Sequence, residues 1–104
     1  MTTRLILLIA ACAGGLLSPA LQAQDTHQAR QLAATCANCH AIAAGPASAL
    51  KPLAGMPADQ IIQAMAQYRS GSQPATIMHQ IAKGYTEAQV RLLAAYLAAQ
   101  PPRP

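Results

Sequence analysis

Hydrophobic positions in this chain recur every three to four residues, which is the spacing of one face of an α-helix. Beyond the first 23 residues, no stretch alternates between apolar and polar residues for long, so the pattern predicts helices and no sheet. Helices are expected over residues 25–39, 57–70, 74–83 and 86–99. A loop rich in proline and glycine is expected over residues 41–57. The chain therefore reads as a small all-α domain of three to five helices.

Residues that favour helix ends mark these segments. Asp25 is expected to cap the first helix, Pro57 fits the first turn of the second, and Gly71 ends it. Thr86 and Gln89 have the spacing of a capping box, which gives the last helix the clearest start in the chain. The apolar faces expected in the core are Ile61, Ile62, Met65 and Tyr68 on the second helix, and Val90, Leu93, Tyr96 and Leu97 on the last.

Residues 1–23 are typical of a secretory signal peptide. Arg4 precedes an apolar run, residues 18–20 break that run, and the small residues up to Ala23 predict cleavage there. The run is too short and too interrupted for a membrane anchor. Lipoprotein processing at Cys12 is an alternative, because small residues precede that cysteine. Residues 24–104 are therefore expected to form an exported domain, in a bacterial periplasm or an equivalent oxidising compartment.

The composition gives this domain few large apolar side chains from which to build a core. Removing 23 of the 104 residues leaves 81, and the whole chain has 25 alanines, three tyrosines, no phenylalanine and no tryptophan. A domain of this size needs a disulfide, a metal or a cofactor to hold its core. The net charge of +4 is mild, and no basic run interleaved with aromatic residues occurs, so nucleic acid is not an expected partner.

The sequence Cys36-Ala37-Asn38-Cys39-His40 matches C-x-x-C-H, the attachment signature of c-type haem. Two cysteines three residues apart face the same side of a helix end and can form thioethers to two vinyl groups of one porphyrin. His40, the next residue, would then supply the proximal imidazole to the iron. A rigid, mostly apolar porphyrin would also replace the missing core material.

Other interpretations of the motif remain open. Cys36 and Cys39 could form a structural disulfide or a redox-active pair, although the latter normally follows a strand in an α/β domain. A zinc site would need four ligands, and only His27 or His79 could complete the set with Cys36, Cys39 and His40.

The sixth ligand of the iron distinguishes electron transfer from gas binding. Met78 is the expected ligand, because it lies far enough along the chain to reach the opposite haem face. His79 would give a bis-histidine haem, Met65 fits the apolar face of the second helix, and Met56 is a weaker candidate. The other ring nitrogen of His40 needs a carbonyl acceptor in the following loop, fixed by Pro46 or Pro52, with Pro46 preferred.

In these residues the chain resembles the class I cytochrome c family. Within it, the segments Pro74–Tyr85 and Ala95-Tyr96-Leu97 resemble those of the cytochrome subunit of flavocytochrome c sulfide dehydrogenase and related small periplasmic cytochromes. The resemblance implies one haem c held by Cys36 and Cys39, with His40 proximal and Met78 distal. It also implies that the terminal helices cross, with Tyr96 in the crossing.

An electron carrier that does no bond chemistry of its own is therefore expected. Its donor would be a redox protein such as a sulfide-oxidising flavoprotein, and an acidic face of that partner would suit Lys51, Arg69, Lys83 and Arg91. The alternatives are a gas-binding or sensing haem protein with an open or displaceable sixth position, and a cytochrome that functions only as a subunit of a flavoprotein complex. Removal of the signal is expected to leave no membrane span.

Overall fold

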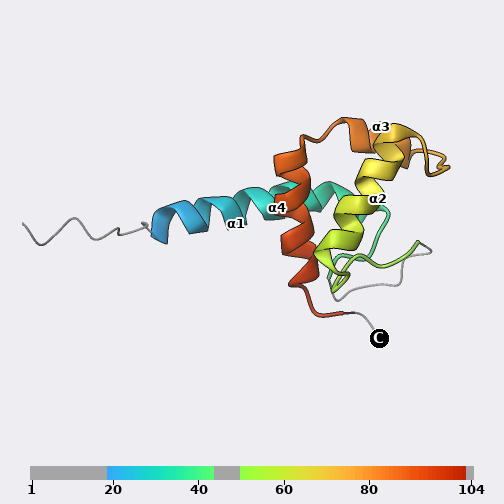
Figure 1. The fold of residues 1–104 in the computed structure, drawn as a ribbon. Coiled ribbons are helices and arrows are strands. Elements are labelled where there is room, and N and C mark those ends of the chain that lie inside the picture. Colours follow the sequence, from blue (N-terminus) through green and yellow to red (C-terminus); the bar gives the residue numbers. More distant parts are fainter. Residues whose placement is uncertain (1–18, 44–49, 103–104) are drawn as a thin grey trace, which may run out of the picture.

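A computed structural model describes residues 19–43 and 50–102 of the chain. Within those residues the elements are α1 (Pro19–Ala34), the 3₁₀ turn η1 (Thr35–Asn38), α2 (Ala58–Ser70), α3 (Met78–Lys83) and α4 (Glu87–Ala98), with no strand among them. The predicted all-α class is confirmed. Figure 1 shows the C-terminal part of α1 crossing behind α4, with α2 and α3 to the right of α4.

Two helix ends were predicted correctly from local sequence. Gly71 ends α2 with a left-handed φ of 80°, a conformation that glycine adopts without a steric penalty. Thr86 caps α4: its side chain accepts from the Gln89 N–H while the Gln89 side chain accepts from the Thr86 N–H.

Two helix starts were predicted wrongly. Helix α1 begins at Pro19 and runs through Asp25, which is therefore not an N-cap. Proline is well suited to a first helical position, and the alanine, leucine and glutamines that follow it are good helix formers. Helix α3 begins at Met78 instead of Pro74, because Ile77, with a φ of −133°, lies outside helical geometry. Thr76 and Ile77 are β-branched and weaken the helix there.

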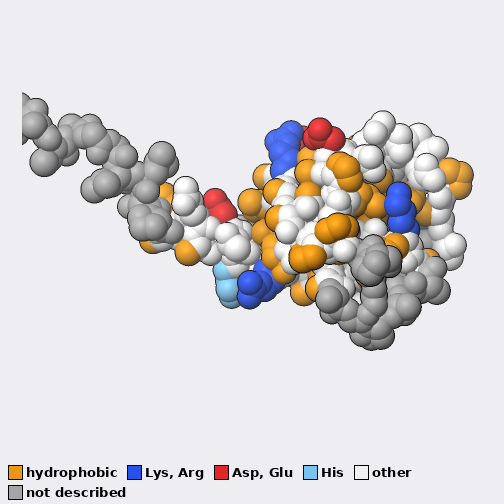
Figure 2. All heavy atoms as spheres, turned by 90° about the horizontal axis from the view of Figure 1, so that it is seen from below, with side chains coloured by type: hydrophobic (Ala, Val, Ile, Leu, Met, Phe, Trp, Pro, Cys, Tyr) orange, Lys and Arg blue, Asp and Glu red, His pale blue; other side chains and the backbone are white. Residues whose placement is uncertain are grey.

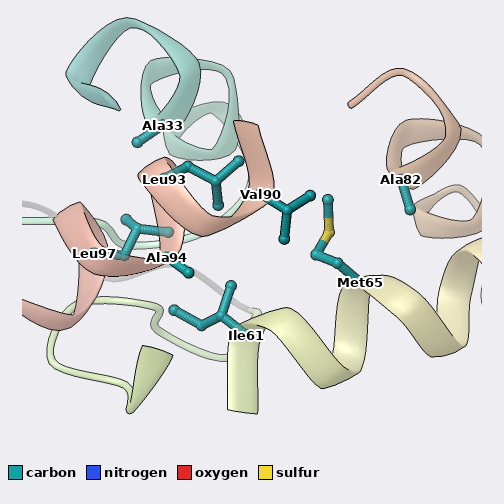
Figure 3. Packing of buried hydrophobic residues seen from close by; sticks show 8 residues of the cluster. All are labelled: Ala33, Ile61, Met65, Ala82, Val90, Leu93, Ala94 and Leu97. Carbon is teal, nitrogen blue, oxygen red and sulfur yellow. The ribbon is translucent and has the colours of Figure 1, made fainter. Parts of the chain in front are cut away.

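The core lies where α1, α2 and α4 meet (Figure 3). Its buried members are Ala33, Ile61, Met65, Ala82, Val90, Leu93, Ala94 and Leu97. Of the predicted apolar faces, Ile62, Tyr68 and Tyr96 are only partly buried at the edge of this cluster. Residues 20–28 of α1 are exposed, and the helix is buried only at Ala29 and Ala33. These two alanines, one turn apart, let α1 approach α4 closely.

The loop before α2 is fastened to the end of α4. The Gly55 N–H donates to the Leu97 carbonyl at 2.9 Å, and Gly55 has a left-handed φ of 73°. A Cβ atom on Gly55 would lie 2.7 Å from the Cβ of Pro102. Only glycine fits this position, so the loop and the segment after α4 pack backbone against backbone.

Two further observations concern the described helices and one face of the surface. None of the helices in residues 19–43 and 50–102 combines the length and the apolar character that a membrane crossing requires. On the face seen in Figure 2, the lysine and arginine side chains stand apart from one another.

Candidate functional site

The predicted attachment motif lies on a tight turn at the end of α1. The α-helix ends at Ala34 and narrows into η1, and the N–H groups of Cys39 and His40 both donate to the Cys36 carbonyl, at 3.2 and 2.8 Å. Cys36 lies within this turn, and Cys39 directly follows it as its C-cap. Cys36 is partly buried and Cys39 is exposed.

The two motif cysteines are not joined to each other in this structure. No disulfide joins Cys36 to Cys39. Burial raises the pKa of the Cys36 thiol, although hydrogen bonds from the Thr35 side chain and the Cys36 backbone act in the opposite direction. Within residues 19–43 and 50–102 the motif follows a helix, whereas a thioredoxin-like pair normally follows a strand.

The orientation of His40 is fixed by one hydrogen bond. Its Nδ1 lies 2.8 Å from the carbonyl oxygen of Lys51. A carbonyl can only accept, so Nδ1 carries a proton, and the neutral tautomer that fits this bond has its lone pair on Nε2. This is the arrangement in which a backbone acceptor holds a metal-ligating imidazole.

The residue that follows this acceptor is Pro52. The carbonyl acceptor expected for His40 is therefore that of Lys51, which directly precedes Pro52. Pro46, the proline preferred from the sequence, lies outside the described residues. Beyond it, the N–H groups of Leu53 and Ala54 both donate to the Ala41 carbonyl, at 2.9 and 3.3 Å. Because Ala41 directly follows His40, these bonds hold the Lys51 carbonyl opposite the imidazole.

Met78 and His79, neighbours at the start of α3, have different surroundings. Met78 is partly buried and packs against the core cluster. His79 lines an open hollow of about 300 Å³ together with Tyr68, Arg69 and Lys83. The Nδ1 atom of His79 is buried and meets no hydrogen-bond partner in the described part of the chain. Of the other sequence candidates, Met65 is in the core and Met56 is partly buried against it.

A set of side chains that the sequence did not reveal joins α3 to the motif turn. The Arg69 guanidinium donates to the Ala82 carbonyl at 3.1 Å and also to the Tyr85 carbonyl. The Tyr85 hydroxyl lies 2.5 Å from the Thr35 hydroxyl, immediately before Cys36. Because two of the acceptors are backbone carbonyls, no residue spacing could have indicated these contacts.

Two arginines considered for docking are thus engaged within the fold. Arg69 binds the two carbonyls, and Arg91 pairs with Glu87 at 3.6 Å on the surface of α4.

The donor set of the motif turn fits a covalently attached haem. It provides two cysteines in and directly after one tight turn, followed by an imidazole whose Nε2 is available to bind iron. It does not fit zinc, since no group of three histidine, cysteine or acidic side chains converges as a metal site within residues 19–43 and 50–102.

Comparisons with known proteins agree with this chemistry. Residues 27–100 match the family model described as cytochrome c. Over 86 residues, the chain is 29% identical to the cytochrome subunit of sulfide dehydrogenase from Chlorobaculum tepidum, covering 83% of this chain and 78% of that protein. The family match extends from α1 through the motif, α3 and α4.

Proposed function

The chain belongs to the cytochrome c family, and we propose that it is an exported, periplasmic carrier whose single haem iron lies between His40 and Met78. It is an electron-transfer protein with haem c, and a carrier rather than an enzyme. The bound haem supplies the one-electron chemistry, by cycling between ferric and ferrous iron. Cys36 and Cys39 hold the porphyrin through two thioether bonds.

The observation that carries this proposal is the contact between His40 and Lys51. The 2.8 Å hydrogen bond from Nδ1 to the carbonyl leaves Nε2 as the only ring nitrogen able to bind a metal. It also fixes the plane of the imidazole before any iron is bound. A histidine held in this way, directly after the two cysteines of the motif, matches a proximal ligand better than a surface side chain.

Met78 is the better distal candidate because of its surroundings. Its side chain packs against the same core cluster that includes Ala33 at the end of α1, whereas His79 lines the hollow at the end of α2. Methionine opposite histidine raises the reduction potential of a haem and closes the iron to external ligands. Both properties suit a carrier, and neither suits the gas-binding alternative.

The relative suggests the class of partner. Because the similar Chlorobaculum tepidum protein is a cytochrome subunit of sulfide dehydrogenase, we place this chain beside a sulfide-oxidising flavoprotein as its electron donor. Co-purification of the haem protein with a flavin-containing chain would support this pairing. A monomer that such a flavoprotein cannot reduce would contradict it.

The axial ligands are tested by absorption spectroscopy of the haem-loaded protein in both oxidation states. Ferric haem with a methionine ligand has a weak far-red absorption band. We expect this band in the natural chain, in Met56→Ala and in His79→Ala, and its loss in Met78→Ala. Met56→Ala is the matched control, because it also shortens a partly buried methionine. A high-spin ferric spectrum of the natural chain would refute methionine ligation and favour gas binding.

A further inference from the structure

We propose that Arg69 and Tyr85 are positioning residues that hold the helix carrying Met78 in register with the turn carrying Cys36. The inference rests on the proposed ligation of the iron by Met78. Arg69 and Tyr85 belong neither to the haem motif nor to the axial pair. The inference gives both side chains a role in keeping Met78 bound to the iron.

Helix α3 cannot hold Met78 in place by itself. It has six residues, of which only Ala82 is buried, and a helix this short has too few internal hydrogen bonds to be stable in isolation. Ile77, just before it, and Ile81 within it are 55% and 38% exposed. The position of the methionine therefore depends on what fastens the ends of this segment.

Arg69 fastens the C-terminal end of α3 to α2. Its guanidinium donates to the carbonyl of Ala82, in the last turn of α3, and to the carbonyl of Tyr85, just beyond that helix. The Ala82 carbonyl also accepts the Tyr85 N–H, at a long 3.5 Å, so Arg69 reinforces a helix end whose own backbone bond is weak. The donor is charged, so these bonds are stronger than bonds between neutral groups. The guanidinium is partly buried, which limits the screening of its charge by water.

Tyr85 continues this connection to the haem turn. Its hydroxyl lies 2.5 Å from the Thr35 hydroxyl and 3.4 Å from the Leu32 carbonyl, both at the end of α1. Thr35 also donates to the Leu32 carbonyl at 3.1 Å, so its own orientation is fixed. Hydrogen bonds of Arg69 and Tyr85 thus connect α2 to the end of α3, and the end of α3 to Thr35, the residue before Cys36. An external ligand that displaces Met78 must move α3 and strain this path.

The test is a titration of the full-length, haem-loaded ferric protein with imidazole, which competes with methionine for the iron. Loss of the far-red band reports the displacement. We expect imidazole to bind about fivefold more tightly to Tyr85→Phe, the factor that corresponds to one net hydrogen bond, and at least as much more tightly to Arg69→Gln. Thr35→Val should bind imidazole as tightly as Tyr85→Phe does. The double variant Tyr85→Phe/Thr35→Val should bind imidazole no more tightly than either single variant.

Two matched controls separate positioning from general stability. Arg91→Gln removes a surface arginine, and Tyr96→Phe removes a tyrosine hydroxyl that makes no hydrogen bond within the described residues. Both should bind imidazole as the natural chain does, even where urea unfolding shows a change in stability. If Arg69→Gln does not retain haem, Tyr85→Phe and Thr35→Val carry the test.

The outcomes distinguish this inference from the proposed function. A natural chain without the far-red band refutes both. A natural chain with the band, together with Tyr85→Phe and Thr35→Val variants that bind imidazole no more tightly than it does, refutes the positioning role and leaves the axial assignment intact. If Arg91→Gln and Tyr96→Phe bound imidazole as tightly as Tyr85→Phe does, the positioning role would also be refuted.

Discussion

Gly55→Ala should destabilise the folded protein more than Gly71→Ala, although both glycines have a left-handed backbone, with φ values of 73° and 80°. A left-handed conformation costs any residue with a Cβ about 1–2 kcal/mol. At Gly71 nothing lies within 4 Å of an added Cβ, so this is the whole expected cost. The pair therefore offers one position with a steric contact and one without it.

The extra cost at Gly55 comes from Pro102. An added Cβ would lie 2.7 Å from its Cβ, 2.9 Å from its Cα and 3.0 Å from its nitrogen, all closer than carbon atoms pack. Forcing atoms into a well-packed contact costs about 1–3 kcal/mol more. Relief requires movement of the loop or of the exposed segment that carries Pro102. If the loop withdraws from the Leu97 carbonyl, the 2.9 Å hydrogen bond of the Gly55 N–H is lost as well.

Urea unfolding of the haem-loaded variants, followed by far-ultraviolet circular dichroism, measures the difference. We expect the free energy of unfolding of Gly55→Ala to be lower than that of Gly71→Ala by about 1–3 kcal/mol. Ending the chain at Gln100 removes Pro102 and should bring the cost of Gly55→Ala close to that of Gly71→Ala. A difference below about 0.5 kcal/mol in the full-length chain would refute the reasoning.

Variants at three further positions test the core, a helix cap and a surface ion pair, each by the free energy of unfolding in urea. Leu93→Ala should lower it by about 2–5 kcal/mol, because the side chain is 2% exposed and its loss leaves a cavity; a loss below about 1 kcal/mol would contradict that packing. Thr86→Ala should cost about 1 kcal/mol and Thr86→Ser much less, and equal losses would show that the capping hydroxyl is unimportant. Glu87→Gln should change stability by less than about 0.5 kcal/mol, since its pair with Arg91 is exposed; a larger loss would reveal a role beyond that pair.

Local sequence was sufficient where the structure is decided locally. The capping box of α4 needs only Thr86 and Gln89 three positions apart, and the end of α2 needs only the freedom of Gly71. The attachment motif is likewise contiguous, so its cysteines and histidine could be identified before any fold was known.

Sequence was insufficient where a backbone carbonyl is the partner. The acceptor for His40 could have been any carbonyl of the following loop, and only the folded chain distinguishes that of Lys51. The role of Arg69 was missed for the same reason, because its acceptors belong to the backbone of α3 and of Tyr85. Its positive charge suggested docking instead. The start of α3 was misjudged because helix propensity is weak near Thr76 and Ile77, where the rest of the fold decides.

The crossing of α1 and α4 has a consequence for the order of assembly. Ala29 and Ala33 are buried against a helix that begins more than fifty residues later, at Glu87. The turn that carries the cysteines is closed by local bonds, from the Cys39 and His40 N–H groups to the Cys36 carbonyl. Contacts between distant parts of a chain form more slowly than local ones. Attachment of haem can therefore precede closure of the core, and α4 then packs onto a turn whose chemistry is already finished.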